Sequence, residues 1–141
     1  MIWDRILGRK PAAAVAPLRG APAVRREKSY SAQTGYVYQY YYEGYREGER
    51  GGRLGNEHVF HVSSDRKTSF PLTVFLSRAV VEEWEGRHGR ALSTTEQYAA
   101  VKLTLFQAFD DRQGLGAATA DVEVDAARME AHLETLGISE P

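Results

Sequence analysis

The chain has 141 residues, of which 43% are hydrophobic, and its 18 basic side chains nearly balance its 19 acidic ones. This length and composition predict one globular domain with a sizeable core. The sequence contains no cysteine, which excludes a disulfide scaffold, a thiolate metal site and a cysteine nucleophile. No stretch approaches the roughly 18 apolar residues that a membrane-spanning helix needs.

The balanced charge hides an asymmetry between the two ends of the chain. Residues 1–28 carry seven basic and two acidic side chains, whereas residues 110–141 carry two basic and eight acidic ones. The pattern indicates either a solvated basic leader and an acidic helix face, or a leader that folds back onto the C-terminal helix. A net charge near zero predicts no nucleic-acid partner. The chain has four lysines and otherwise arginine as its basic residues, and this usage is typical of a bacterial, cytoplasmic protein.

Residues 1–10 form a short segment with apolar side chains at helical spacing, and residues 11–28 form a basic linker rich in Ala and Pro. Residues 1–10 predict an amphipathic segment that docks on an unidentified protein partner. An unstructured start, docking on the chain's own domain, and peripheral contact with a membrane through the neighbouring cations are the alternatives. The predicted partner-binding residues are Ile2, Trp3, Ile6 and Leu7.

Three runs in the first half of the chain predict strands. They are Tyr36–Glu43, Glu57–Val62 and Phe70–Leu76, which are rich in aromatic and β-branched residues. A polar, glycine-rich stretch at residues 43–56 is expected to be a long loop, and residues 63–69 a turn. The three runs predict an antiparallel three-stranded meander.

Tyrosines alternate along the first of these strands, so that Tyr36, Tyr38, Tyr40 and Tyr42 share one face. We expect this face to be core against packed helices, because tyrosine buries a large apolar ring. A protein-contact surface is one alternative. A stacking platform for single-stranded nucleic acid is another.

The second half of the chain predicts two to three helices. Ser77 can cap one that ends at Gly89, and Ser93 with Glu96 forms a capping box for the next. After a glycine-containing break, Asp121 is expected to cap a third helix. Strands followed by helices, without alternation, predict an α+β domain at residues 29–137 with the helices on one face of the sheet.

Candidate chemistry is sparse. His58 and His61 lie three residues apart on a strand, where they point to opposite faces, so we expect no metal site and no cofactor. Glu57 and Ser63 share a face with His61, but Glu57 and His61 are about 13 Å apart along a strand, too far for a catalytic triad. We therefore assign no catalytic residue.

These observations lead to a hypothesis and two alternatives. We predict a small non-catalytic module for protein–protein interaction, tethered to the docking segment, and the sequence leaves a homo-oligomer open. The first alternative is an enzyme or a module that binds a small anionic ligand through His61, Arg66 and Lys67, because the turn at residues 63–69 combines hydroxyls with adjacent cations. The second is single-stranded nucleic-acid binding on the tyrosine face.

Overall fold

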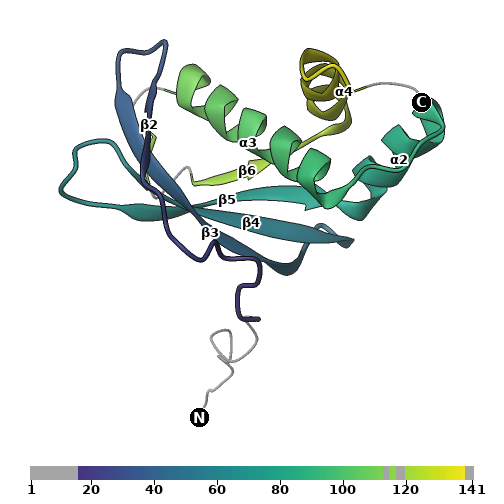
Figure 1. The fold of residues 1–141 in the computed structure, drawn as a ribbon, viewed down its shortest axis with the longest axis horizontal. Helices are drawn as coiled ribbons and strands as arrows, with labels where there is room; N and C mark the ends of the chain where they lie inside the picture. Colours follow the sequence, from purple (N-terminus) through teal and green to yellow (C-terminus); the bar gives the residue numbers. More distant parts are fainter. Residues whose placement is uncertain (1–15, 113–114, 117–119, 139–141) are drawn as a thin grey trace.

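The computed structural model describes residues 16–112, 115–116 and 120–138, which form a mixed α+β fold with a five-stranded sheet. The strands lie in the order β2-β3-β4-β5-β6, and the helices lie on one side of the sheet (Figure 1). The strands are β2 (Lys28–Ser31), β3 (Val37–Arg50), β4 (Arg53–Ser63), β5 (Phe70–Ser77) and β6 (Asp121–Glu123). The helices are α2 (Arg78–His88), α3 (Thr94–Asp111) and α4 (Ala126–Thr135).

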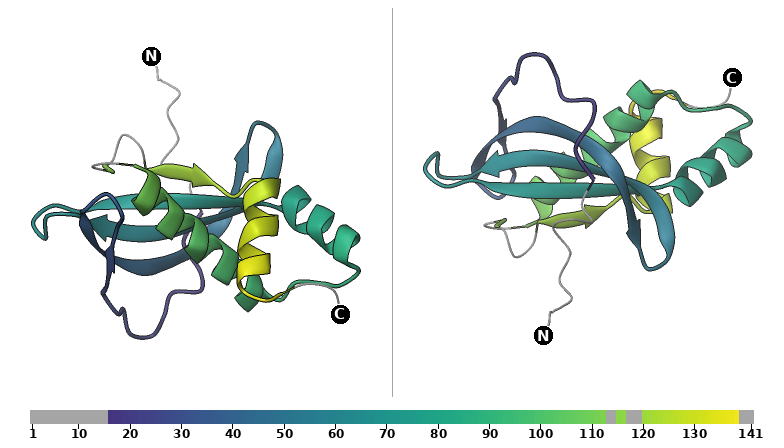
Figure 2. Two further views of the ribbon diagram at one scale, coloured as in Figure 1. Left: turned by 90° about the horizontal axis from the view of Figure 1, so that it is seen from above. Right: turned by 90° about the horizontal axis from the view of Figure 1, so that it is seen from below.

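The predicted meander corresponds to the three central strands, and the structure adds an edge strand on each side. β2, β3, β4 and β5 pair antiparallel in chain order. β6 instead runs parallel to β5, because α2 and α3 lie between the two strands in the chain and carry it back to the same end of the sheet. The sequence-based meander is therefore a coarser description of a five-stranded, curled sheet (Figure 2).

The glycine-rich stretch that was expected to be a long loop is a hairpin instead. β3 and β4 remain paired out to Arg50 and Arg53, and a turn at Gly51 and Gly52 joins them. Both glycines have positive φ, 58° and 81°, which suits the tight turn of a two-residue hairpin. Arg46 lies opposite Glu57 and pairs with it, and Arg50 also binds Glu57, so the polarity of the stretch does not prevent strand formation.

The first two helices begin where the sequence predicts, and the third does not. The side chain of Ser77 accepts the N–H of Val80 at the start of α2, and Ser93 forms the expected capping box at the start of α3. The cap of α4 is Asp125 rather than Asp121, which is the first residue of β6. The chain stays extended from residue 121 because the side chain of Val122 enters the core from β6.

The tyrosine face packs against the helices and contributes to the core. The side chains of Tyr38 and Tyr40 are only 0% and 6% exposed, and the ring of Tyr38 stacks on Phe109 of α3 with centroids 4.2 Å apart. Tyr36 lies at the margin and is 39% exposed. His58 is buried on the same face, as its place beside Phe60 and Val62 in the sequence predicts.

The segment before β2 lies against the free edge of β3. Arg19 and Tyr45 exchange two backbone N–H···O bonds of 2.8 Å, which forms an isolated bridge. Gly44 has φ 128°, and a Cβ there would collide with the carbonyl oxygen of Arg19, so this close approach requires glycine. The predicted docking residues at positions 2, 3, 6 and 7 lie outside the described residues. Among the described helices, none has the length and apolar character to cross a bilayer.

Candidate anion-binding site

A pocket of about 330 Å³ lies where β4 turns into β5, and it brings the predicted ligand-binding residues together. His61 contributes from β4, while Arg66 and Lys67 contribute from the β4–β5 loop. We call this site the loop pocket. Its lining residues are Glu27, Gln39, Tyr41, His61, Val62, Ser63, Arg66, Lys67, Thr68 and Ser69.

The loop that carries the two cations is held by the carboxylate of Asp65. This carboxylate accepts the backbone N–H of Lys67 at 2.8 Å and of Thr68 at 2.9 Å, and also the hydroxyl of Thr68. These bonds favour the ionised form and hold the pKa of Asp65 at about 2. Arg66 adopts a positive φ of 64°, and its N–H donates to the hydroxyl of Ser63 at 2.9 Å. The loop therefore has a defined shape that places its cations.

Arg66 and Lys67 carry charges that the described part of the chain does not neutralise directly. Both side chains are exposed, and neither forms an ion pair with another described residue. The nearby carboxylate of Asp65 is already hydrogen-bonded within the loop. Glu27 is the one acidic side chain among the described residues that line the pocket. The two cations can therefore attract an anion to the loop pocket.

The wall of the pocket formed by β3 contains a buried amide. Gln39 is 4% exposed, and its Oε1 has no hydrogen-bond partner among the described residues. Gln39 pairs in the sheet with Ser63, which places it beside the start of the loop. An amide presents either a donor or an acceptor when it rotates, and leaving it unpaired in a buried position costs about 1–3 kcal/mol. The pocket wall therefore contains a buried amide oxygen without a partner among the described residues, and rotation of the amide would turn its NH₂ group to that position.

His61 lies on the other wall, between an aromatic ring and a hydroxyl. Its Nε2 lies 2.7 Å from the hydroxyl oxygen of Ser69, and its ring stacks on Tyr41 with centroids 5.1 Å apart. The Nδ1 atom of His61 lies 3.8 Å from a carboxylate oxygen of Glu43. The guanidinium of Arg25 lies over the ring of Tyr41, 5.4 Å from its centroid. These contacts fix the orientation of the imidazole, with a serine hydroxyl at Nε2 and a carboxylate on the Nδ1 side.

The residues that share a face with His61 have separate partners. Glu57 binds Arg46 and Arg50, and the hydroxyl of Ser63 interacts with the loop at Asp65 and Arg66. His58 faces the helices, on the opposite side of the sheet from His61. Within the described ranges, no three His, Cys, Asp or Glu side chains are grouped to hold a metal ion.

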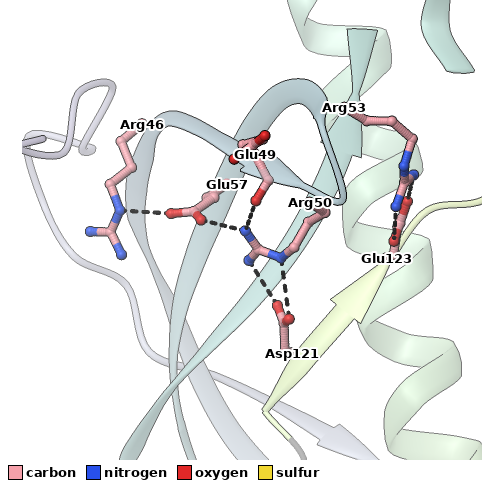
Figure 3. Close-up of polar contacts among 7 residues, drawn as sticks. All are labelled: Arg46, Glu49, Arg50, Arg53, Glu57, Asp121 and Glu123. Atoms are coloured by element: carbon pink, nitrogen blue, oxygen red, sulfur yellow. Dashed lines mark hydrogen bonds and ion pairs between the residues drawn. The ribbon is translucent and has the colours of Figure 1, made fainter. Parts of the chain in front are cut away.

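An ion-pair network occupies the same side of the sheet, towards the β3–β4 turn (Figure 3). Glu57 bridges Arg46 and Arg50, with N–O distances of 2.8 and 2.7 Å. Arg50 also binds Asp121, and Arg53 binds Glu123, so the hairpin is tied to β6. The pairing of Glu57 with two arginines lowers its pKa although burial opposes this. The network was not predicted, because its three arginines lay in a stretch interpreted as a loop and Asp121 was interpreted as the cap of a helix.

Comparisons of the chain with protein-family models, curated proteins and solved structures give no significant match. A function for this protein must therefore be argued from the chemistry of its own side chains.

Proposed function

We propose that this protein is a non-catalytic module that binds a small polar anion in the loop pocket. The observation that carries the proposal is the combination of two cations, Arg66 and Lys67, with the buried amide of Gln39, whose Oε1 is unpaired, in one pocket. The cations supply attraction to a carboxylate or phosphate, and the amide supplies a directional hydrogen bond. Of the alternatives that the sequence leaves open, this function corresponds to the module that binds a small anionic ligand through His61, Arg66 and Lys67, rather than to the enzyme.

The lining favours a ligand that also carries hydroxyl groups. The hydroxyl of Thr68 donates to Asp65, so its oxygen can accept a further bond, and Ser69 and His61, which bond to each other, also line the pocket. The volume of about 330 Å³ is at the lower end of the range for small-molecule sites. A hydroxy acid or a sugar phosphate has the required size, charge and polarity.

The test is calorimetric titration of the full chain with malate, glucose 6-phosphate and inorganic phosphate at low salt. We expect at least one of these probes to bind, and Arg66→Ala and Gln39→Leu each to weaken that binding by about tenfold, since one charge-assisted hydrogen bond contributes about 1.4 kcal/mol. Arg78→Ala is the matched control, because Arg78 is an exposed arginine at the start of α2 and does not line the pocket. Equal affinity in the Arg66→Ala and Arg78→Ala variants, or no binding of any probe, would contradict the proposal.

Docking on a protein partner through Ile2, Trp3, Ile6 and Leu7 is the second candidate function. It is supported by the helical spacing of these apolar residues and by the bridge between Arg19 and Tyr45, which attaches the following segment to β3. A partner bound to residues 1–10 would thus be held near the sheet edge. The two functions are compatible, because they use different parts of the chain.

A further inference from the structure

A second pocket of about 330 Å³ lies at the edge of β3, on the side where α3 covers the sheet. We call it the tyrosine pocket. It shares one lining residue, Tyr41, with the loop pocket. Its lining residues are Pro22, Val24, Arg26, Lys28, Tyr40, Tyr41, Tyr42, Tyr98 and Lys102.

The tyrosine pocket exists because the edge of β3 loses its strand partner. β2 begins at Lys28 opposite Tyr40, and the next pairing on this edge is the bridge between Arg19 and Tyr45. Residues 20–27 are eight residues set against the four residues 41–44 of β3, so the segment bows outward (Figure 2). The bowed segment and α3 form the walls, and the aromatic edge of β3 forms the base.

Three cations line this pocket, and no acidic residue among the described ones does so. Burial lowers the pKa of Lys102, because it disfavours the charged ammonium group. The nearby positive charge of Lys28 lowers this pKa further. The Nζ of Lys102 lies 5.9 Å from the ring centroids of both Tyr40 and Phe106. These rings compensate part of its desolvation but do not neutralise it. A bound anion would remove the repulsion between the two lysines.

The aromatic part of the tyrosine pocket includes Tyr42 from the base and Tyr98 from the α3 wall. Tyr42 and Tyr98 pack edge to face with centroids 4.8 Å apart, and Tyr98 is half-buried on α3. The hydroxyl of Tyr42 is already engaged, 2.9 Å from Nδ1 of His58. Tyr42 and Tyr98 therefore offer a ligand their ring surfaces, on which a planar group can stack or pack.

We infer that the tyrosine pocket binds an aromatic phosphate, that is, a small molecule in which a planar ring is joined to a phosphate dianion. The phosphate would lie between Lys28 and Lys102, with Arg26 at the rim, and the ring would pack on Tyr42 and Tyr98. A dianion suits three cations without a carboxylate better than a monoanion does. The inference is independent of the loop pocket, because the two sites use different cations.

Phenyl phosphate is the probe, and the full chain is titrated with it while amide chemical shifts are followed by NMR. We expect shifts concentrated at residues 26–28, 40–42, 98 and 102, and an affinity at least tenfold tighter than that for inorganic phosphate or for phenol. Benzoate, a monoanion of similar shape, should bind more weakly than phenyl phosphate. If inorganic phosphate shifts the amides of these residues with an affinity as tight as that of phenyl phosphate, the ring contributes nothing and the inference is wrong.

The variants separate this site from the loop pocket and from a folding defect. Lys28→Ala and Lys102→Met should each weaken phenyl phosphate about tenfold, and Lys102→Met keeps an apolar stem of similar length in a half-buried position. Lys28 is exposed, so its substitution should leave the thermal unfolding midpoint unchanged. Lys67→Ala is the matched control and should not alter phenyl phosphate binding as followed at the residues of the tyrosine pocket. Loss of binding in Lys67→Ala, or full binding in both pocket variants, would overturn the assignment.

Discussion

Arg50 on β3 and Asp121 on β6 form a two-bond ion pair that connects residues 71 positions apart in the sequence. The Nη2–Oδ1 distance is 3.0 Å and the Nε–Oδ2 distance is 3.2 Å (Figure 3). Arg50 also binds Glu57 and lies over the ring of Phe75, 4.9 Å from its centroid. One guanidinium thus joins β3 and β4 to β6, a strand of three residues.

We predict that Arg50→Ala lowers the free energy of unfolding by about 1–2 kcal/mol, because it leaves two carboxylates without a shared cation. Arg50→Lys should lose most of the same stability, since an ammonium cannot reproduce the two-bond geometry. Arg53→Ala is the control, because Arg53 is 46% exposed in its pair with Glu123, and it should cost less than about 1 kcal/mol. Chemical denaturation measures all three. Equal losses for Arg50→Ala and Arg53→Ala would contradict the central place of Arg50.

The buried tyrosines give a second prediction. Tyr38→Ala and Tyr40→Ala should each destabilise the protein by about 3 kcal/mol, as large aromatic truncations in cores do. Tyr38→Phe should cost about 1 kcal/mol, because the Tyr38 hydroxyl accepts the buried N–H of Leu115 at 3.2 Å. Tyr36→Ala, at an exposed position of the same face, should change stability little. Denaturation curves in which Tyr38→Ala matches Tyr36→Ala would refute the core assignment.

Part of the loop pocket could be predicted because its main residues are close in the sequence. His61, Arg66 and Lys67 lie within one strand end and the loop that follows, so local pattern was sufficient to group them. Gln39 was missed because it enters the pocket through strand pairing with Ser63, a register that periodicity alone does not give. The buried, unpaired amide has no signal in the sequence.

The tyrosine pocket and β6 could not be predicted for a related reason. Lys28 and Lys102 meet through the packing of α3 on the sheet, and Lys28 lay in the predicted linker. β6 has three residues, which is too short for an alternation to be recognised, and its pairing with β5 is parallel and distant in sequence. Conversely, the capping box at Ser93 is local, and it was predicted correctly.

Because His58 is buried, we predict that the protein loses stability in mild acid. Burial lowers its pKa to about 4, below the value of about 6.5 in an unfolded chain. Between these values the unfolded state binds the proton and the folded state does not, so stability falls as the pH is lowered from about 6.5 to about 4. The difference corresponds to an order of 3 kcal/mol.

His58→Asn is the variant for this prediction, because asparagine places an oxygen near the position of Nδ1 and does not titrate. Its unfolding free energy should change less between pH 7 and pH 5 than that of the unaltered protein. His61→Asn is the matched control, since His61 is partly exposed on the other face, and it should keep the full dependence. Identical pH profiles for His58→Asn and the unaltered protein would assign the acid sensitivity to other groups.

The last prediction is that Ile2, Trp3, Ile6 and Leu7 are the main partner-docking element. Burying these four side chains could contribute up to roughly 6–12 kcal/mol, much of it offset by ordering the segment and by lost translational freedom, so we expect micromolar affinity. Trp84 is removed first, because it is the other tryptophan. Its side chain is 1% exposed and its Nε1 has no hydrogen-bond partner in the described part, so Trp84→Phe sacrifices no such bond.

In this background the fluorescence of Trp3 should be that of a water-exposed indole in the isolated protein, and vesicles of anionic lipid should not change it. A variant with serine at positions 2, 3, 6 and 7 should lose any partner that the unaltered chain retains in a pull-down, while Ser substitutions at the exposed positions 54 and 136 should not. A blue-shifted emission in the isolated monomer would mean that the segment docks on its own domain, and a blue shift with vesicles alone would mean that it binds membranes. Either result would contradict partner docking, because the apolar side chains would already have another place to be buried.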